Sequence, residues 1–324
     1  MKFATLAAGM VALLTSVSIT QAEEFRMLSG WPENQSYTVN AAIPFIEKVK
    51  ELSNGEITIQ LDGPEVVAPF EQIEPVQMGV FDLLFTHPAY HIGTAAIGLG
   101  IEGTKSDPEL RRSSGVFDTM DEYYQGLGLK AIAVAPVGSV AFNFILKDPV
   151  GDSPSLTGRK IRGTQTYNPV IEGLGASPVV LPMPDIYSAL QTGVIDGAGT
   201  TLTGLKEKKW YEVAGYLSRP KFGVVSLFIF MNLEKWNALS DEQKEIMEKA
   251  AVALESETSD KFDALAAEEE AFLLENGMQI SEMPQEDAEQ VNKMIFDGAW
   301  KTASAAGPLA EKMHEQAREA GLAE

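Results

Sequence analysis

The sequence contains no cysteine and only three histidines among its 324 residues. Without cysteine there is no disulfide framework, no thiol nucleophile, no thiolate metal site and no lipid-anchoring cysteine. Positive charge is also scarce, since 25 lysines and arginines stand against 46 aspartates and glutamates, giving a formal net charge of −21. Nucleic acid and anionic membrane surfaces repel such a chain at long range, so we expect neither as a partner.

Long hydrophobic runs are lacking as well, apart from one near the N-terminus. There Lys2 precedes an apolar run from Leu6 to Val17, and Thr-Gln-Ala ends at Ala22. This order is typical of a signal peptide, and the run is shorter than the roughly 20 residues that a membrane span needs. We predict a signal peptide over residues 1–22, cleaved after Ala22, and a free periplasmic protein. An N-terminal membrane anchor is the alternative.

The remaining chain alternates between strand and helix patterns, and its length favours two α/β domains. A polar Pro/Gly stretch over residues 147–158 is the expected entry to the second domain. Pro44 lies inside one expected helix and is expected to kink it. The expected N-terminal elements are strands at 23–30, 56–61, 80–86 and 129–137 and helices at 36–52 and 70–78.

A much longer helix is expected near the C-terminal third. Ser240 and Gln243 have the spacing of a capping box, and an apolar stripe then continues as far as Asn276. Roughly 36 residues of helix extend about 54 Å at 1.5 Å per residue. This length exceeds the diameter of one domain, so the helix is predicted to bridge two.

Catalytic patterns are weak. His87 and His91 in "HPAYH" have the i, i+4 spacing of a helical metal pair, but Pro88 favours two ordinary loop histidines. The segment 98–103, "GLGIEG", matches the dinucleotide fingerprint without a clear preceding strand or following helix. We therefore predict no catalytic residue, no metal site and no cofactor, and no enzymatic activity. A secreted enzyme and a sensory ligand-binding subunit remain alternatives.

Arg162 lies where an apolar strand gives way to a loop, and composition alone leaves open that it is a surface residue. Its block "SLTGRKIRG" is followed by "GASPVVLPMPDIYSALQTGVIDG", "KKWYEVAGYLS" and "MNLEKWNALSDEQKEIMEKAA". In this order the blocks resemble those of the DctP-type solute-binding proteins of TRAP (tripartite ATP-independent periplasmic) transporters.

The resemblance implies a periplasmic-binding-protein-like α/β fold, with two domains joined by hinge strands, a ligand cleft between them and a long helix across both. It also implies delivery of a small organic acid to the small and large TRAP membrane subunits. The expected boundaries are residues 23–139 plus about 228–267 for domain I and 140–227 plus about 268–324 for domain II.

The resemblance further implies that Arg162 pairs with a ligand carboxylate, for which a planar guanidinium supplies two parallel donors. Phe142 stands where some relatives carry a second arginine, and Thr200 where many carry an asparagine. The other positions carried over as ligand-binding are Trp31, Phe70, Thr86, His87, Tyr90 and Met183.

These departures bear on the ligand. The aromatic positions favour a monocarboxylate with an apolar or aromatic body, and His87 and Thr200 are expected to contact a hydroxyl or keto group beside the carboxylate. Trp31, Phe70 and Phe142 also have an ordinary explanation as core or hinge packing.

Overall fold

The computed structural model describes residues 23–323. The expected signal peptide lies outside the described residues, and the first strand begins at Glu23. Within residues 23–323 no helix combines the length and the hydropathy that crossing a membrane requires.

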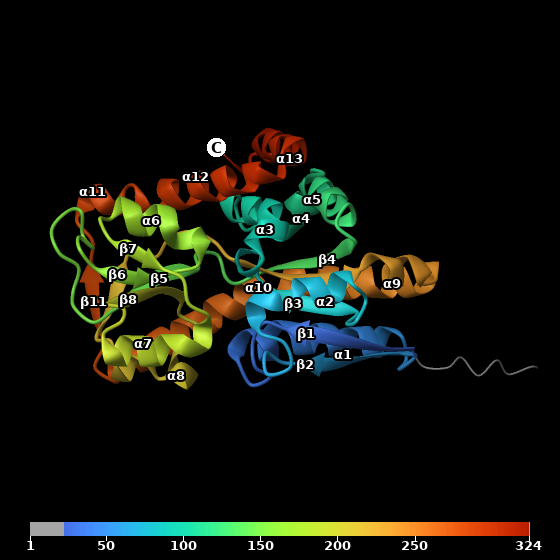
Figure 1. The fold of residues 1–324 in the computed structure, drawn as a ribbon, viewed down its shortest axis with the longest axis horizontal. Coiled ribbons are helices and arrows are strands. Elements are labelled where there is room, and N and C mark those ends of the chain that lie inside the picture. The colour runs from blue at the N-terminus through green and yellow to red at the C-terminus, as the bar shows by residue number, and fades with distance from the viewer. Residues whose placement is uncertain (1–22, 324) are drawn as a thin grey trace, which may run out of the picture.

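The described chain forms two mixed sheets that lie side by side with helices around each (Figure 1). We call the part built on the first sheet domain I and the part built on the second domain II. The first sheet has the order β2 (Ile57–Asp62), β1 (Glu23–Ser29), β3 (Leu83–Thr86), β10 (Ser226–Asn232), β4 (Leu129–Pro136). The second has the order β11 (Gln279–Glu282), β9 (Tyr216–Arg219), β5 (Phe142–Leu146), β8 (Gly197–Thr201), β6 (Lys160–Arg162), β7 (Ser177–Val179). The prediction of two α/β domains is confirmed.

The helices fall into three groups. Around the first sheet lie α1 (Ile43–Leu52), α2 (Ile73–Gln77), α3 (Ile92–Ala95), α4 (Pro108–Ser113), α5 (Val116–Gln125) and α9 (Leu233–Ala238). Around the second lie α6 (Asn168–Gly173), α7 (Ile186–Thr192), α8 (Leu205–Lys208) and α11 (Gln285–Ala288). The remaining three are α10 (Asp241–Glu275), α12 (Val291–Ala303) and α13 (Pro308–Glu319).

The N-terminal elements differ from expectation in detail. The helix expected over 36–52 contains a π-helical turn, Thr38–Ala42, in which the Ile43 N–H bonds to the Thr38 carbonyl. Pro44 follows directly, in the first turn of α1, and has no N–H to continue the α pattern. The helix expected over 70–78 is divided into a 3₁₀ turn and the short α2.

The strand β10 shows how the first sheet is covered. Leu227, Ile229 and Met231 join the core that contains α1 and α10, whereas Phe228 and Phe230 join the core that contains α5 and α13. Successive side chains of a strand point to opposite faces, so this sheet is buried on both sides.

The long helix α10 spans 35 residues and begins with the expected Ser240–Gln243 capping box. In domain I, its Glu255 accepts hydrogen bonds from Arg112 and from the Val134 N–H. In domain II, its Glu269 accepts from the Gly204 and Lys206 N–H groups. The prediction that this helix bridges both domains is confirmed.

Two further segments connect the domains, from β4 to β5 and from β9 to β10. They are hydrogen-bonded to each other, because the Val137 N–H bonds to the Val225 carbonyl at 2.9 Å and the Ala141 N–H to the Gly223 carbonyl at 3.0 Å. Phe142 pairs with Phe222 in the same way. We call these paired segments, residues 137–142 and 222–225, the hinge ribbon.

The "GLGIEG" motif lies in a buried 3₁₀ segment, Ala96–Gly103. A Cβ on Gly98 would come within 2.3 Å of the Tyr124 hydroxyl, and one on Gly100 within 2.5 Å of Met313. These glycines therefore allow close packing of α5 and α13 against the segment, and they do not form a phosphate-binding loop.

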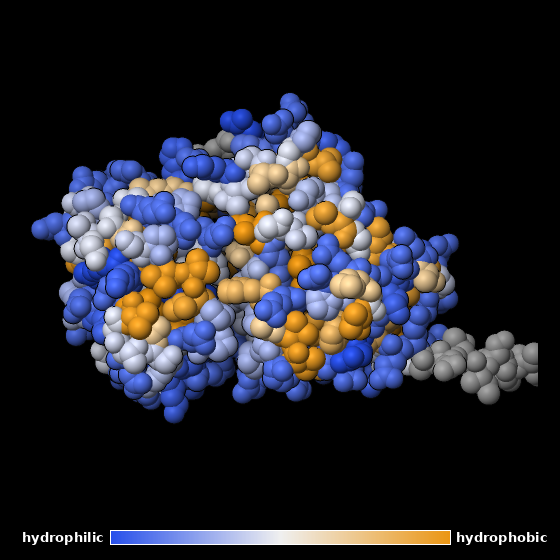
Figure 2. All heavy atoms as spheres, in the orientation of Figure 1, coloured by the Kyte–Doolittle hydropathy of each residue, from blue (hydrophilic) through white to orange (hydrophobic). Residues whose placement is uncertain are grey.

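The C-terminal segment expected in domain II is spread over both domains. Strand β11 joins the second sheet, α12 contacts both the 3₁₀ segment and α6, and α13 packs against α5 in domain I. The face drawn in Figure 2 is mainly hydrophilic, with several hydrophobic groups, one of them on domain II beside the junction and others over domain I.

Candidate functional site

Arg162 is the last residue of β6, and its side chain is only 2% exposed. Its Nε donates to the Leu181 carbonyl at 2.8 Å and its Nη1 to the Gly199 carbonyl at 3.2 Å. Among residues 23–323, the ion pairs give Arg162 no carboxylate partner. An unneutralised buried cation is unfavourable, so this position favours an anion beside it.

Arg162 borders a small cavity of about 40 Å³ between the two domains. Domain I, domain II and the hinge ribbon all contribute to its wall. The lining residues are Trp31, Tyr37, His87, Tyr90, Phe142, Arg162, Thr164, Tyr167, Met183, Val225 and Leu227.

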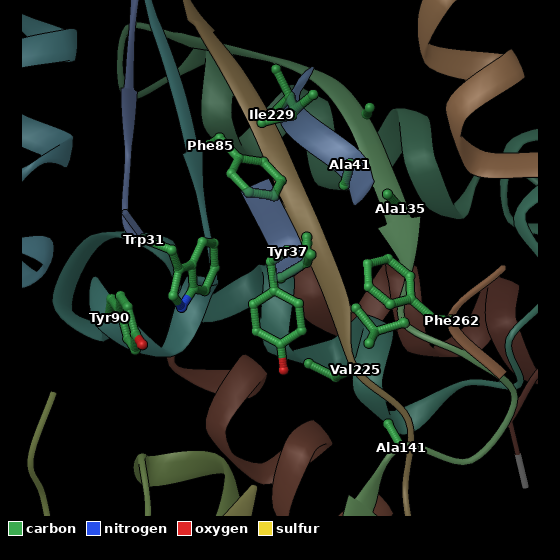
Figure 3. Packing of buried hydrophobic residues seen from close by; sticks show 14 of the residues in the cluster. Trp31, Tyr37, Ala41, Phe85, Tyr90, Ala135, Ala141, Val225, Ile229 and Phe262 are labelled. Carbon is green, nitrogen blue, oxygen red and sulfur yellow. The ribbon is translucent and has the colours of Figure 1, made fainter. Parts of the chain in front are cut away.

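The domain I wall of this cavity is aromatic. The Trp31 ring meets Tyr37 edge to face at a centroid distance of 5.1 Å and lies 5.7 Å from Tyr90. Phe85 supports Trp31 from β3 at 5.2 Å. Figure 3 shows the Trp31 nitrogen and the Tyr37 and Tyr90 hydroxyls directed toward the same end of this group.

The domain II wall adds a second aromatic pair beside Arg162. Phe142 and Tyr167 have their ring centroids 4.6 Å apart. Gly199 makes this arrangement possible, since a Cβ there would come within 2.5 Å of the Tyr167 ring. Burial raises the pKa of Tyr167 well above its ordinary value, so its hydroxyl stays neutral.

One side-chain hydrogen bond joins the two domains beside the cavity. The Tyr37 hydroxyl of domain I bonds to the Thr201 hydroxyl of domain II, which lies 3.2 Å from the Thr203 hydroxyl. Burial raises the pKa of Tyr37, so this phenol remains protonated. The bond requires the two domains to be close together.

The two histidines of "HPAYH" bond to different partners. His87 accepts from the Ala89 N–H through Nδ1, which leaves the Nε2 proton for the bond to Glu102. The His91 Nε2 lies 2.9 Å from the Thr86 hydroxyl. Burial, with His87 close by, lowers the pKa of His91 to about 4.

Six of the nine carried-over residues line the cavity: Arg162, Trp31, His87, Tyr90, Phe142 and Met183. The other three lie behind the wall. Phe70 packs edge to face against Tyr90 at 4.9 Å, and Thr86 is fully buried against His91. The Thr200 hydroxyl donates to the Thr201 carbonyl at 3.1 Å, and strand alternation places Thr201, not Thr200, on the side of Tyr37.

Sequence reasoning missed five lining residues: Tyr37, Thr164, Tyr167, Val225 and Leu227. A signal existed for two of them, because Thr164 and Tyr167 lie in "RGTQTYNP", the polar stretch that directly follows Arg162. The others resemble ordinary helix and strand residues.

Comparison with known proteins decides the family. Residues 28–303 match the model of the DctP family, bacterial extracellular solute-binding proteins of family 7. The chain belongs to this family. DctP-family proteins of TRAP transporters bind solutes and are not enzymes, so this chain is a solute-binding protein.

Three known proteins illustrate the likeness. Solute-binding protein RD1_1052 of Roseobacter denitrificans is 26% identical over 84% of this chain and 86% of its own. Its structure contains bound L-galactonate. Superposed on this chain, that structure gives a TM-score of 0.73, with 20% sequence identity, and the match covers 91% of this chain and 99% of that one. The monocarboxylate 2-oxoacid-binding periplasmic protein all3028 of Nostoc is 27% identical over 84% of this chain and 77% of its own.

A TRAP solute-binding protein of Desulfovibrio salexigens, solved with bound orotic acid, has a TM-score of 0.80 at 19% identity. The match covers 92% of this chain and 98% of that one. The periplasmic-binding-protein-like fold that the resemblance implied is therefore confirmed.

Proposed function

We propose that this DctP-family protein binds an organic monocarboxylate between its domains and delivers it to the small and large TRAP membrane subunits. The observation that carries the proposal is the buried Arg162, which lacks a carboxylate partner among the described residues. The Leu181 and Gly199 carbonyls orient the guanidinium through Nε and one Nη1 proton. The remaining Nη1 and Nη2 protons form the parallel pair that a carboxylate accepts.

The ligand body is proposed to be apolar or aromatic. Trp31, Tyr90, Phe142 and Tyr167 surround the cavity, and an apolar ligand body gains about 25 cal/mol for each Å² of its apolar surface that such rings remove from water. A sugar acid leaves hydroxyls poorly paired there. The Nostoc relative, named for monocarboxylate 2-oxoacids, supports this assignment, whereas the Roseobacter relative with L-galactonate shows that the family also accepts polyhydroxy acids.

Ligand binding is proposed to favour the closed arrangement. The cavity wall comes from both domains, so a ligand reaches all of its contacts only when they are close together. The hinge ribbon is the expected site of bending. Small-angle X-ray scattering is expected to show a smaller radius of gyration with ligand than without it, and an unchanged radius at saturation contradicts closure.

The protein is proposed to act in the periplasm after cleavage following Ala22. Named relatives are periplasmic binding proteins, which supports this location. N-terminal sequencing of a periplasmic extract is expected to begin at Glu23. Recovery of Met1 on a membrane-bound product would mean that the chain is anchored.

The decisive experiment identifies what the protein carries. Mass spectrometry of acid-extracted, periplasm-purified protein is expected to find a monocarboxylate. A thermal-shift panel then ranks acids, because ligand bound to the native state raises the melting temperature. Aromatic and branched-chain 2-oxo, 2-hydroxy and plain acids are expected to exceed dicarboxylates and hexuronates. The reverse ranking would show that the aromatic residues only pack the domains together.

A further inference from the structure

The indole nitrogen of Trp31 is a buried donor without a hydrogen-bond partner. The residue is 3% exposed and lines the cavity beside Arg162. An indole N–H donates and cannot accept, and a buried donor that stays unpaired loses its hydration without compensation. The unpaired indole N–H therefore lowers the stability of the protein without ligand. This cost indicates that the N–H finds its acceptor on the ligand.

The orientation of Trp31 is fixed by its surroundings. The backbone N–H of Trp31 donates to the Ser29 hydroxyl oxygen at 3.2 Å, and that hydroxyl donates to the Trp31 carbonyl at 2.7 Å. The ring is held against Phe85, Tyr37 and Tyr90. The unpaired nitrogen is therefore a property of a well-packed residue, and Figure 3 shows it at the end of the ring nearest Tyr90.

Tyr90 connects this donor to Arg162. Burial raises the pKa of the Tyr90 phenol, and the neighbouring Arg162 guanidinium and Trp31 indole act in the opposite direction. Both groups therefore lie near the same hydroxyl. Trp31 and Arg162 also line the same small cavity, so a ligand whose carboxylate is held by Arg162 extends beside Trp31.

The polar residues first expected to contact that part of the ligand are already engaged. His87 uses Nδ1 for Ala89 and Nε2 for Glu102, and the Thr200 hydroxyl proton goes to the Thr201 carbonyl. The Trp31 indole N–H lies near the Tyr90 hydroxyl but does not reach hydrogen-bond geometry with it, so it remains available to a ligand oxygen.

We propose that the Trp31 indole N–H donates a hydrogen bond to an oxygen on the carbon next to the ligand carboxylate. This inference rests on the proposed function, since Arg162 must hold the carboxylate. A 2-oxo oxygen is a pure acceptor and suits the indole best, and a 2-hydroxyl oxygen also accepts. A 2-ammonium group only donates, so 2-amino acids are disfavoured.

The test compares matched acids on matched variants by isothermal titration calorimetry. The probes are 4-methyl-2-oxopentanoate and 4-methylpentanoate, then phenylpyruvate and 3-phenylpropanoate. Wild type is expected to prefer each 2-oxo acid by about 10-fold or more, the equivalent of one hydrogen bond. Trp31→Phe keeps an aromatic ring without the donor. It is expected to weaken 2-oxo acid binding by about 10-fold and to change plain-acid binding by less than about 3-fold.

Trp236→Phe is the control, because Trp236 is a buried tryptophan that does not line the cavity. It is expected to keep the wild-type preference. If Trp31→Phe weakens both acids of a pair equally, or keeps the preference, Trp31 only packs and the inference is wrong.

Arg162→Ala separates this inference from the proposed function. If it leaves the binding of both acids unchanged, or if wild type binds neither pair, the monocarboxylate proposal itself fails.

NMR of the wild-type protein tests the donor role without any variant, so its result does not depend on whether Trp31→Phe folds. The sequence has four tryptophans, and one indole N–H resonance is expected to move strongly downfield with the 2-oxo acid but not with the plain acid. Equal spectra with both acids overturn the donor role.

Discussion

Arg111 in domain I and Arg162 in domain II are each only 2% exposed, yet their surroundings differ. Arg111 donates from Nε to the Thr104 hydroxyl, from Nη1 to the Ser226 hydroxyl and from Nη2 to two backbone carbonyls. Burial lowers its pKa to about 10, and Glu255 is the foremost of the nearby carboxylates that oppose this change. Arg162 has two carbonyl partners and no ion pair among the described residues.

The contrast teaches that burial alone does not mark a binding residue. Four of the five N–H donors of Arg111 bond to the protein, and the residue joins a loop, a strand and α4 into one core. Arg162 has donors left over at a cavity that two domains share. The first arrangement stabilises the fold, and the second is suited to an anionic ligand.

Replacing Arg162 is the strongest way to test this contrast. Arg162→Ala removes one partner of a buried charge pair, which typically costs about 3–5 kcal/mol, or roughly 10²–10³-fold and more in affinity. The melting temperature without ligand is expected to stay the same or rise. Calorimetry with the acid found in the purified protein measures the loss. Binding within a few-fold of wild type contradicts the assignment.

Arg111→Met is the counterpart in domain I. It leaves four buried acceptors without a charged donor, and the free energy of unfolding is expected to fall by about 3 kcal/mol or more. Urea denaturation measures this value, and the folded protein is expected to bind ligand within about 3-fold of wild type. If affinity falls and stability does not, the roles of the two arginines are reversed.

His91 extends the comparison from buried arginines, which stay charged, to a buried histidine, which is neutral when folded. Its folded pKa of about 4 lies below the ordinary 6.5, so the unfolded chain binds the extra proton as pH falls through this window. Stability is therefore full above pH 6.5 and declines toward pH 4, by about 2 kcal/mol between pH 7 and 5. Urea denaturation of wild type and His91→Gln at both pH values measures it. An identical decline in the variant assigns it to other groups.

The smallest expected effect concerns the hydrogen bond between Tyr37 and Thr201, which joins the two domains. Tyr37→Phe removes the hydroxyl that makes this bond. Because the bond forms only when the domains are close together, only the closed state is destabilised, by about 0.5–1.5 kcal/mol. Ligand affinity is expected to fall by about 2- to 12-fold. Thr201→Val is the reciprocal variant, and the double variant tests coupling. Additive losses in the double variant show that the two hydroxyls act independently.

Short-range sequence patterns correctly predicted helix starts and strands, because neighbouring residues determine these features. The capping box fixed the start of α10, and alternation in "EITIQL" correctly indicated β2, in which Ile57 and Ile59 are buried. Arg162 stood out through its strand-end position and the family blocks around it. Tyr37 and Thr201 did not, because their contact joins residues far apart in sequence and depends on how the domains meet. The choice between Thr200 and Thr201 depended on strand register, where one residue reverses the face.

The hinge ribbon has a mechanical consequence. Two segments hydrogen-bonded side by side are expected to bend together about one axis and to resist independent twisting, so we expect the domains to rotate about this strip as rigid bodies. Phe142 belongs to this strip and also to the wall of the cavity. We therefore expect a ligand that rests against its ring to limit how far the domains close, and the outer surface formed by both domains to differ with the ligand bound.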